Sequence, residues 1–309
     1  MRRWQKQGLL FAPKGDLSWA RSYAHIPTVE LTEEGFVRVY FASLDAEKFG
    51  RIGYVDLDFD NPKRIRHVAT EPVLGLGELG TFDDSGAVPS CVLRVGEKRH
   101  LYYIGFQRTE RVPYMLFSGL AIGNADGSFT RTSTIPILDR TPEEPYSRSA
   151  PFVLLEDGIW KMWYWSCRKW VSDEQGVHYS NVVRYATSAD GATWKTDEHV
   201  CIAPNEPDEY SIGRPCVLRQ GGLYRMWFSA RSFSRLYVIG YAESGDGLHW
   251  ERRDEEAGIE KSATGWDSEM ICYPYVIEIN GKLHMFYNGN QHGATGFGYA
   301  VLEGVSRCG

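Results

Sequence analysis

The sequence has 309 residues, a formal net charge of −6, 14% aromatic residues, 32 glycines and 14 prolines. This length allows a substantial hydrophobic core, and the aromatic and turn-forming residues favour short strands joined by tight turns over helices. An acidic chain without a block of Lys or Arg argues against a nucleic acid as the main partner. No apolar run reaches the roughly 20 residues of a membrane-spanning helix, and the N-terminal MRRWQKQGLL lacks the apolar stretch of a secretory signal. We therefore predict a cytoplasmic protein that binds neither nucleic acid nor a membrane.

The six cysteines are scattered along the chain, and none forms a Cys-x-x-Cys pair. They stand at positions 91, 167, 201, 216, 272 and 308. A chain of this size has no need of a disulfide scaffold. We predict free thiols, no metal site and no cofactor, with the cysteines at 91, 216 and 272 as small buried residues.

From residue 27 onward, the sequence contains five copies of one repeat, which consists of a proline, a short apolar strand, a glycine turn and an aromatic-rich strand. The copies begin PTVELTEEGFVRVYF, PSCVLRVGEKRHLYYIGF, PFVLLEDGIWKMWYWS, PCVLRQGGLYRMWFSAR and PYVIEINGKLHMFYNGN. Their prolines, at positions 27, 89, 151, 215 and 274, are 62, 62, 64 and 59 residues apart. Periodic self-similarity at this length predicts an array of supersecondary units.

Each of the first four units has a second half, in which an apolar strand meets an Asn-Pro or Asp-Gly turn and a further strand follows. These halves read RIGYVDLDFDNPKRI, SGLAIGNADGSFTR, VVRYATSADGATWKT and VIGYAESGDGLHWER. Asp-Gly between strands is a strong hairpin signal, so each unit predicts four antiparallel strands, the arrangement of a propeller blade.

The fifth unit has only TGFGYAVLEG as its third strand before the chain ends. The N-terminal WQKQGLLFAP resembles WKTDEHVCIAP, the fourth strand of unit three, so we expect residues 4–12 to complete the fifth blade. Such closure removes the exposed strand edges that invite aggregation. The fold prediction is an all-β, five-bladed β-propeller with four antiparallel strands per blade, in one domain over residues 1–309.

A four-stranded unit of this kind has two unlike faces. The segment before its first strand and the connection between its second and third strands share one face, here called the entrance face. The short turns EEG, GEK, EDG, QGG and NG and the Asp-Gly turns share the other, here called the turn face. The long segments rich in charged and aromatic residues fall on the entrance face, where we expect the functional site.

The five segments that precede the repeat prolines are WARSYAHIP, TFDDSGAVP, EEPYSRSAP, DEYSIGRP and WDSEMICYP. Four of them carry neighbouring carboxylates, and the first carries Arg21 and His25 instead. An acid at such a place either caps a turn or pairs with an Arg, or it belongs to a shared site. Because the first strand is the innermost strand of a blade, we expect these groups to converge at the axis.

Carboxylates, cationic donors, amides and aromatic rings together suit a sugar, whose hydroxyls need polar partners and whose C–H face needs a ring. We predict three catalytic carboxylates: Asp84, Glu209 and Glu269. The predicted substrate-binding residues are Arg21, His25, Asp83, Arg148, Asp208, Arg214, Arg231, Asp267, Asn288, Asn290 and His292.

The five repeats and the acidic segments resemble the five-bladed β-propeller glycosidases, a group that includes arabinanases, xylosidases, invertases, levansucrases and β-mannoside phosphorylases. The resemblance covers nearly the whole chain. The runs WARSYAHIP, GELGTFDDSGAVPS, DEYSIGRP and GWDSEMICYPYV resemble more closely uncharacterised glycosidase-like proteins associated with bacterial surface-polysaccharide gene clusters.

In arabinanase-type members, the resemblance implies an Asp on the first blade, an Asp on the second and a Glu on the third. This chain offers His25 and no Asp in the first unit, Asp83 and Asp84 in the second, and Glu144 in the third. Phosphorylase-type members place an Asp directly before the second repeat proline, where this chain has Val88. The resemblance therefore implies the location of the site rather than the role of each residue.

We predict a carbohydrate-active enzyme that cleaves or transfers a glycosyl group with axial carboxylates. The Arg-rich connections favour an anionic ligand, namely a uronic or sialic-type acid, a sugar phosphate, inorganic phosphate or a nucleotide sugar used in surface-polysaccharide biosynthesis. The alternative is a non-hydrolytic sugar or nucleotide-sugar binding protein, or a repurposed enzyme, because a fold does not fix a function. The sequence leaves the oligomeric state open.

Overall fold

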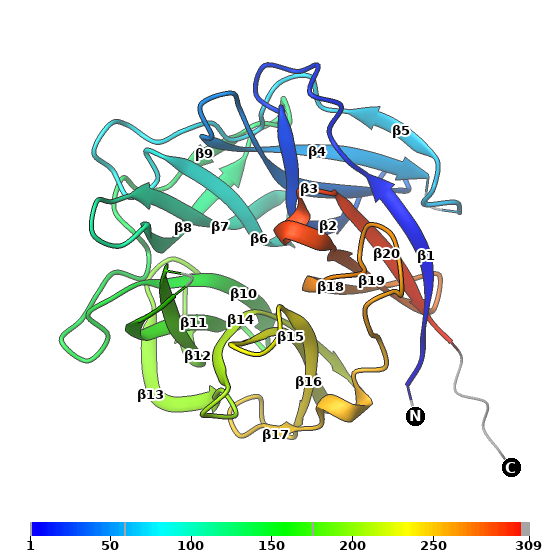
Figure 1. Ribbon diagram of the computed structural model, residues 1–309. Coiled ribbons are helices and arrows are strands. Elements are labelled where there is room, and N and C mark those ends of the chain that lie inside the picture. The colour runs from blue at the N-terminus through cyan, green and yellow to red at the C-terminus, as the bar shows by residue number, and fades with distance from the viewer. Residues whose placement is uncertain (1, 59, 175, 304–309) are drawn as a thin grey trace, which may run out of the picture.

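The computed structural model describes residues 2–58, 60–174 and 176–303, and these are built almost wholly from strands (Figure 1). The helical segments of the described residues are a 3₁₀ turn, Asp254–Glu256, and the four-residue α1, Asn290–Gly293, in which Gln291 and His292 have positive φ. Neither of these is long and apolar enough to cross a membrane. Cys308 lies outside the described residues.

Twenty strands in the described residues fall into five groups of four. The first two groups are β2 (Ser22–Leu31), β3 (Phe36–Leu44), β4 (Gly50–Asp58) and β5 (Ile65–Val68), then β6 (Gly86–Val95), β7 (Lys98–Arg108), β8 (Tyr114–Gly123) and β9 (Phe129–Arg131). The third and fourth are β10 (Arg148–Glu156), β11 (Ile159–Asp173), β12 (Gly176–Ser188) and β13 (Lys195–Ile202), then β14 (Glu209–Gln220), β15 (Leu223–Ser232), β16 (Val238–Ser244) and β17 (Glu251–Arg252). The fifth is β18 (Cys272–Ile279), β19 (Lys282–Asn288), β20 (Phe297–Leu302) and, from the other end of the chain, β1 (Trp4–Phe11).

Successive strands within each group pair antiparallel, and β1 pairs antiparallel with β20, from Trp4 opposite Leu302 to Phe11 opposite Phe297. The expected strand at residues 4–12 is therefore present to within one residue. Single parallel pairs join the first four groups into a 16-stranded sheet, whereas the fifth forms a separate four-stranded sheet. The hydrogen-bonded ladders thus do not form a continuous ring.

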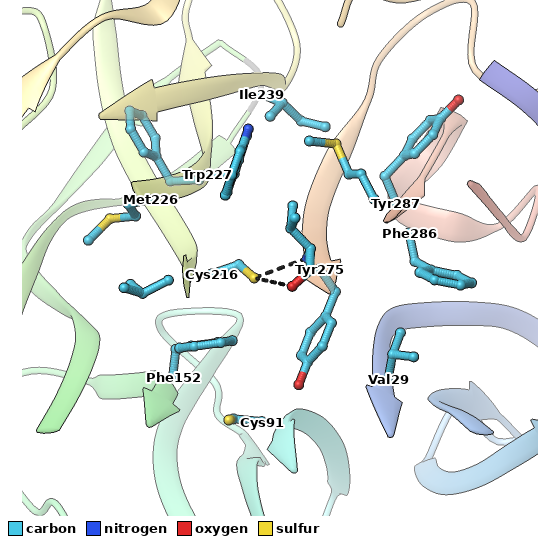
Figure 2. Close-up of a cluster of buried hydrophobic side chains, with 14 of the residues drawn as sticks. Val29, Cys91, Phe152, Cys216, Met226, Trp227, Ile239, Tyr275, Phe286 and Tyr287 are labelled. Carbon is cyan, nitrogen blue, oxygen red and sulfur yellow. Dashed lines mark hydrogen bonds between the residues drawn. The ribbon is translucent and has the colours of Figure 1, made fainter. Parts of the chain in front are cut away.

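The first strands of the five groups contact one another in cyclic order: β2 with β6, β6 with β10, β10 with β14, β14 with β18, and β18 with β2. Figure 1 shows these strands toward the middle of the molecule, with β5, β9, β13, β17 and β1 at the periphery. Figure 2 shows one side chain from each first strand in a common core: Val29, Cys91, Phe152, Cys216 and Tyr275.

The repeat proline coincides with an irregularity in every first strand. All five strands show a register shift at or beside it, and four of the residues that precede it have positive φ, namely Ile26, Ala150, Arg214 and Tyr273. A proline has no N–H, so a bulge placed there loses no ladder hydrogen bond from that residue. A bulge bends its strand, which frees the residues just before the proline to face the axis.

Two cysteines tie neighbouring first strands together. The backbone N–H of Val153 lies 3.5 Å from Cys91 Sγ, and that of Val276 lies 3.1 Å from Cys216 Sγ. Burial raises the pKa of the Cys91 thiol to about 11 and that of Cys216 to about 12, so both are inert thiols. The five described cysteines are free and buried, which confirms the prediction for positions 91, 216 and 272.

The third unit departs from the expected pattern of short strands joined by irregular segments on the entrance face. Its second and third strands continue as a long hairpin, paired from Lys169 opposite Ser180 to Asp173 opposite Gly176. The segment KWVSDEQGVHYS is rich in aromatic and β-branched residues, which favour strand geometry over a loop. This hairpin carries Tyr179 to the site described next.

Candidate functional site

A cavity of about 580 Å³ lies on the entrance face, and all five groups of strands contribute to its wall. It is lined by Tyr23, His25, Ile26, Ala42, Leu44, Lys48, Gly50, Ser85, Gly86, Val88, Ile104, Phe106, Arg108, Thr109, Pro113, Tyr114, Leu116, Tyr179, Arg231, Tyr273 and His292. His25, Ile26, Val88 and Tyr273 come from the bulged starts of β2, β6 and β18, so the repeat geometry positions this axial pocket.

The charged lining residues of the pocket are all cationic, because none of its described lining residues is an Asp or Glu. Arg231, at the end of β15, has its guanidinium 5.7 Å from the ring centroid of Tyr210 and 5.3 Å from that of Tyr237. These cation–π contacts hold the side chain, and no carboxylate of the described residues forms an ion pair with it. Lys48 and Arg108 add positive charge where the connections reach the solvent.

Two histidines meet in this pocket. Burial lowers the pKa of His25 to about 3, with a further contribution from His292. Burial and then Arg231 lower the pKa of His292 to about 4. Both rings are therefore neutral at pH 7, and the buried Nε2 of His25 has no hydrogen-bond partner within the described structure. An atom of this kind is suited to bind a ligand hydroxyl.

Tyrosine side chains form much of the remaining wall. Burial raises the pKa of Tyr114 to about 12 and raises the pKa values of Tyr179 and Tyr273 well above the usual range. These hydroxyls stay protonated and can donate hydrogen bonds, while their rings provide apolar faces. The pocket thus combines neutral hydrogen-bond donors, aromatic ring faces and a guanidinium.

Asp84 is the predicted catalytic residue that stands closest to the pocket in the chain, directly before the lining residues Ser85 and Gly86. Its carboxylate accepts hydrogen bonds from the Ser85 hydroxyl at 2.9 Å and the Gly80 N–H at 3.0 Å. The Ser85 oxygen in turn accepts the Arg108 N–H at 3.2 Å. Asp84 is half-buried, so part of it is accessible to solvent.

One acid of each acidic segment serves a different purpose, because it is buried and pairs with a cation of its own group. Asp83 Oδ2 lies 2.6 Å from Nε of Arg131 in β9. Glu209 Oε2 lies 2.7 Å from Nη1 of Arg252 in β17, and Asp267 Oδ2 lies 2.7 Å from Nζ of Lys6 in β1. Glu144 lies 3.1 Å from Arg148 and 3.8 Å from Arg184 of β12. These four acids, here called the tie acids, are 1–4% exposed and do not line the pocket.

Three of the four tie acids have a second partner, a tyrosine at a repeated position of the second strand. The hydroxyls of Tyr103, Tyr164 and Tyr287 donate to Asp83, Glu144 and Asp267 at 2.9, 3.0 and 2.9 Å. The fourth group has Phe228 there, with the Arg252 guanidinium 5.2 Å from its ring centroid. The acid therefore recurs because it joins the segment before the first strand to the outer strands.

The other predicted residues mostly hold the frame together. Arg21 is exposed and donates to the Gly15 carbonyl, Asp208 accepts from Ser234, and Asn290 accepts the Glu269 N–H and donates to the Gly265 carbonyl. Asn288 joins β19 to β2, accepting the Ile26 N–H at 2.7 Å and donating to the Ala24 carbonyl at 2.7 Å. The side chain of Glu269 is exposed outside the pocket.

Arg214 lies in the core rather than in the pocket wall. It is 2% exposed, and its Nη2 donates to Thr28 Oγ1 and to the Ser90 carbonyl, both at 2.9 Å. It thus joins β14 to β2 and β6 across the axis. Burial lowers its pKa to about 10, so it remains a cation at pH 7.

Of the predicted site residues, the structure brings His25, Arg231 and His292 together in one pocket. Sequence reasoning did not include the lining residues Tyr23, Tyr114, Tyr179 and Tyr273 among the ligand contacts. Tyr273 stands directly before a repeat proline, and that position could have indicated it. Tyr179 had no such signal, because its place depends on the hairpin of the third unit.

Removal of a tie acid is expected to lower stability. Asp83→Ala leaves the partly buried Arg131 without its carboxylate and leaves the Tyr103 hydroxyl unpaired, which should cost about 3–5 kcal/mol in the free energy of unfolding. Urea unfolding followed by tryptophan fluorescence measures this. Glu97→Ala, at an exposed turn of the same unit, is the control and should change stability by less than about 0.5 kcal/mol. Equal stability of the two variants would show that the tie is dispensable.

Comparison with solved structures defines the class of fold. A glycoside hydrolase superposes with a TM-score of 0.75 at 18% identity, over 98% of this chain and 92% of that chain. A thermostable family-43 glycoside hydrolase gives 0.71 at 15%, over 93% and 95%. A structure from work on the GH130 family of mannoside phosphorylases, which contains glycoside hydrolases that target β-1,2 mannosidic linkages in Candida mannan, gives 0.72 at 14%, over 97% and 93%. The chain thus has the all-β, propeller-like fold found in glycosidases.

Sequence comparison places the chain more narrowly. It is 39% identical over 300 residues to uncharacterized protein MT1551 of Mycobacterium tuberculosis strain CDC 1551, and to uncharacterized protein Rv1502 of strain H37Rv. Each match covers 97% of this chain and 99% of the relative. The chain belongs to the same family as these two proteins. It matches no protein-family model.

Proposed function

We propose that this protein is a glycosidase-like, carbohydrate-active enzyme that binds an anionic glycosyl group in the axial pocket and cleaves or transfers it. The observation that carries the proposal is Arg231, whose guanidinium lies 5.7 and 5.3 Å from two tyrosine ring centroids in a pocket with no Asp or Glu among its described lining residues. A cation without a carboxylate partner of its own is available to a ligand carboxylate or phosphate. The glycosidase fold of the structural neighbours supports a sugar as the rest of the ligand.

The proposal includes the frame that holds the pocket. The five groups are the blades of a closed five-bladed propeller in one domain over residues 1–309, with β1 as the outer strand of the fifth blade. The cyclic contacts of the five first strands and the pairing of β1 with β20 support this. An axial pocket is then the place where all five blades contribute side chains.

The substrate side of the proposal is a uronic or sialic-type acid, a sugar phosphate or a nucleotide-linked sugar. Neutral His25 and His292 bind sugar hydroxyls without adding charge, so Arg231 supplies the charge selectivity. The resemblance of the sequence to proteins of surface-polysaccharide clusters supports a cytoplasmic role in polysaccharide biosynthesis.

For the reaction itself, we propose Asp84 as the carboxylate that acts on the glycosidic oxygen or on the attacking group. The hydrogen bonds from Ser85 and Gly80 hold its side chain, it directly precedes the lining residues Ser85 and Gly86, and its partial exposure leaves it accessible. Glu269 remains a candidate for the second carboxylate because its side chain is exposed on the same face. The burial of Glu209 in its ion pair with Arg252 favours a structural role for that residue.

A specific observation favours the alternative, a non-hydrolytic sugar-binding protein. His25 belongs to the first unit, where the resemblance implies an acid, and Val88 stands at the phosphorylase-type acid position. Both line the pocket. A glycosidase-like fold whose pocket has no acid in these two places can bind a sugar without cleaving it.

Calorimetry and a turnover assay distinguish the enzyme hypothesis from the binding-protein hypothesis. The full chain is titrated with methyl glucuronide, sialic acid, sugar 1-phosphates, nucleotide sugars and neutral methyl glycosides. The same compounds and neutral and acidic oligosaccharides are assayed for release of reducing sugar or phosphate. We expect charged sugars to bind and at least one to be turned over. Binding without turnover across the set favours the binding protein, and binding confined to neutral sugars contradicts the role of Arg231.

Binding of an anionic sugar is expected to be linked to proton uptake. In the free protein, His25 and His292 are neutral at pH 7 because their pKa values lie near 3 and 4. A bound anion favours the imidazolium form, but both rings stay neutral well above these pKa values, so affinity should be nearly constant from pH 7 to 5 and should rise, with proton uptake, as the pH falls toward 4. Titrations in buffers of different ionisation enthalpy measure the protons taken up. In a His25→Gln, His292→Gln double variant, uptake should disappear, and its persistence would assign it to another group.

A further inference from the structure

A second, smaller cavity adjoins the axial pocket at Arg231. Its volume is about 190 Å³, and it is lined by Tyr210 and residues 231–236, which form the end of β15 and the connection to β16. Arg231 lines both cavities. The two cavities are therefore separated by no more than this one side chain.

The connection that forms the second cavity is held in place by hydrogen bonds. Asp208 accepts the Ser234 N–H at 2.9 Å and the Ser234 hydroxyl at 2.5 Å, and its backbone carbonyl accepts the Phe233 N–H at 3.0 Å. The rings of Phe233 and Tyr210 have centroids 4.5 Å apart. A loop fixed in this way loses little conformational entropy when a ligand binds.

The chemistry of this cavity is cationic and aromatic. Arg235 is exposed at its edge, and no carboxylate of the described residues forms an ion pair with Arg231 or Arg235. Phe233 is 45% exposed, although a ring of this size usually packs inside a protein. Two guanidinium groups suit the oxygens of a phosphate, and an exposed ring suits stacking on a base.

We propose that the second cavity is a subsite for a phosphate that joins the glycosyl group in the axial pocket to its leaving part. The ligand is then a glycosyl phosphate or a glycosyl diphosphate. This assignment rests on the proposed function, since it requires a glycosyl group in the axial pocket. Arg235 is a specificity residue in this arrangement: it distinguishes phosphate-linked sugars from sugars whose only charge lies on the glycosyl ring.

The test is calorimetry on the full chain and on Arg235→Gln, Arg231→Gln and Phe233→Ala, with melting temperatures as the check on folding. The probes are the 1-phosphates of glucose, galactose and mannose, their UDP or GDP forms, the methyl glycosides of the same sugars, and methyl glucuronide. Arg64→Gln, an exposed arginine on the turn face, is the matched control.

For at least one sugar, we expect the 1-phosphate to bind the parent chain about 10-fold or more tightly than the methyl glycoside. Arg235→Gln should remove about 10-fold of affinity for the 1-phosphate and leave methyl glucuronide unchanged, whereas Arg231→Gln should weaken both. Phe233→Ala should weaken only the UDP or GDP forms if the leaving part is a nucleoside diphosphate, and should change no ligand if it is phosphate alone.

Two results overturn the subsite while leaving the proposed function intact. One is equal affinity of the parent for 1-phosphates and methyl glycosides, and the other is unchanged 1-phosphate binding by Arg235→Gln, each while Arg231→Gln still weakens methyl glucuronide. If no charged sugar binds the parent, the proposed function fails and the subsite fails with it.

Discussion

Asp84→Asn is expected to lower kcat by about 10²–10⁴-fold on the substrate that the turnover assay identifies, with binding changed only a few-fold. This is the usual effect of removing a general acid or base that is not required for affinity. The substitution preserves the size of the side chain and an oxygen for one of its two hydrogen bonds, because the Ser85 hydroxyl and the Gly80 N–H donate to different carboxylate oxygens. Steady-state kinetics with separate kcat and KM values, together with a melting curve, measure the effect.

Glu209→Gln is the matched comparison, because it makes the same chemical change at a tie acid. It removes the charge opposite Arg252 in a buried pair, so it should lower the melting temperature while the kcat of the folded protein stays within a few-fold of the parent. Glu269→Gln tests the second candidate carboxylate. If Asp84→Asn keeps near-normal kcat, the acid–base role of Asp84 is refuted and this residue only orients its neighbours.

Deletion of residues 1–13 is expected to abolish soluble, folded protein. The deletion removes β1 and exposes the whole edge of β20 as unpaired N–H and C=O groups. It also removes Lys6, leaving the buried carboxylate of Asp267 without its cation. The deletion also removes Trp4, whose side chain is 5% exposed. Its ring centroid lies 6.0 Å from that of Trp227 in an edge-to-face arrangement, and its Nε1–H donates to the Ala257 carbonyl at 3.0 Å. Expression trials and melting curves of the truncated chain measure the outcome.

A rescue arm isolates the cause of this failure. Co-expression of a peptide with residues 1–13 should restore soluble protein if the missing strand is the reason, and a Trp4→Ala, Lys6→Ala version of the peptide should restore much less. A truncated chain that stays soluble with an unchanged melting temperature would show that β1 is not needed to complete the fifth group.

The arrangement of strands could be predicted because it repeats. Five copies of a proline, two apolar strands and a turn specify antiparallel groups, and the similarity of residues 4–13 to residues 194–204 located the strand that pairs with β20. The bulge could not be predicted from this pattern, because hydrophobic alternation does not report a residue at positive φ. The recurring proline marks the position of the bulge in the sequence. The reason for the proline is apparent only from the strand register, which shifts at or beside it in all five first strands.

The sequence predicted the location of the site better than it predicted which residues line it. Sequence position put His25, Arg231 and His292 on the entrance face, and they line one pocket. The sequence could not distinguish the buried tie acids from the acids that face solvent, because both kinds have the same neighbours in sequence. Only the partners on outer strands, such as Arg131 for Asp83 and Lys6 for Asp267, distinguish them. Those partners lie up to 261 residues away in the chain.

The structure also explains why acidic segments recur although no Asp or Glu is among the described lining residues of the pocket. Each acidic segment contains one tie acid, and its loss should destabilise the fold whatever the activity. The second acids Asp84 and Glu269 form no ion pair within the described residues, whereas Asp208 holds Ser234. Recurrence of an acid in a repeat therefore reports the frame first, and a catalytic role needs the separate evidence of contact with the pocket.

The most direct test of the central claim is a crystal structure of the full chain with the charged sugar that binds most tightly in calorimetry. The account predicts the sugar ring in the axial pocket between His25, His292 and the tyrosines, with an acidic group within hydrogen-bonding distance of Arg231. A sugar bound on the turn face, or in the pocket with its acidic group away from Arg231, would contradict it.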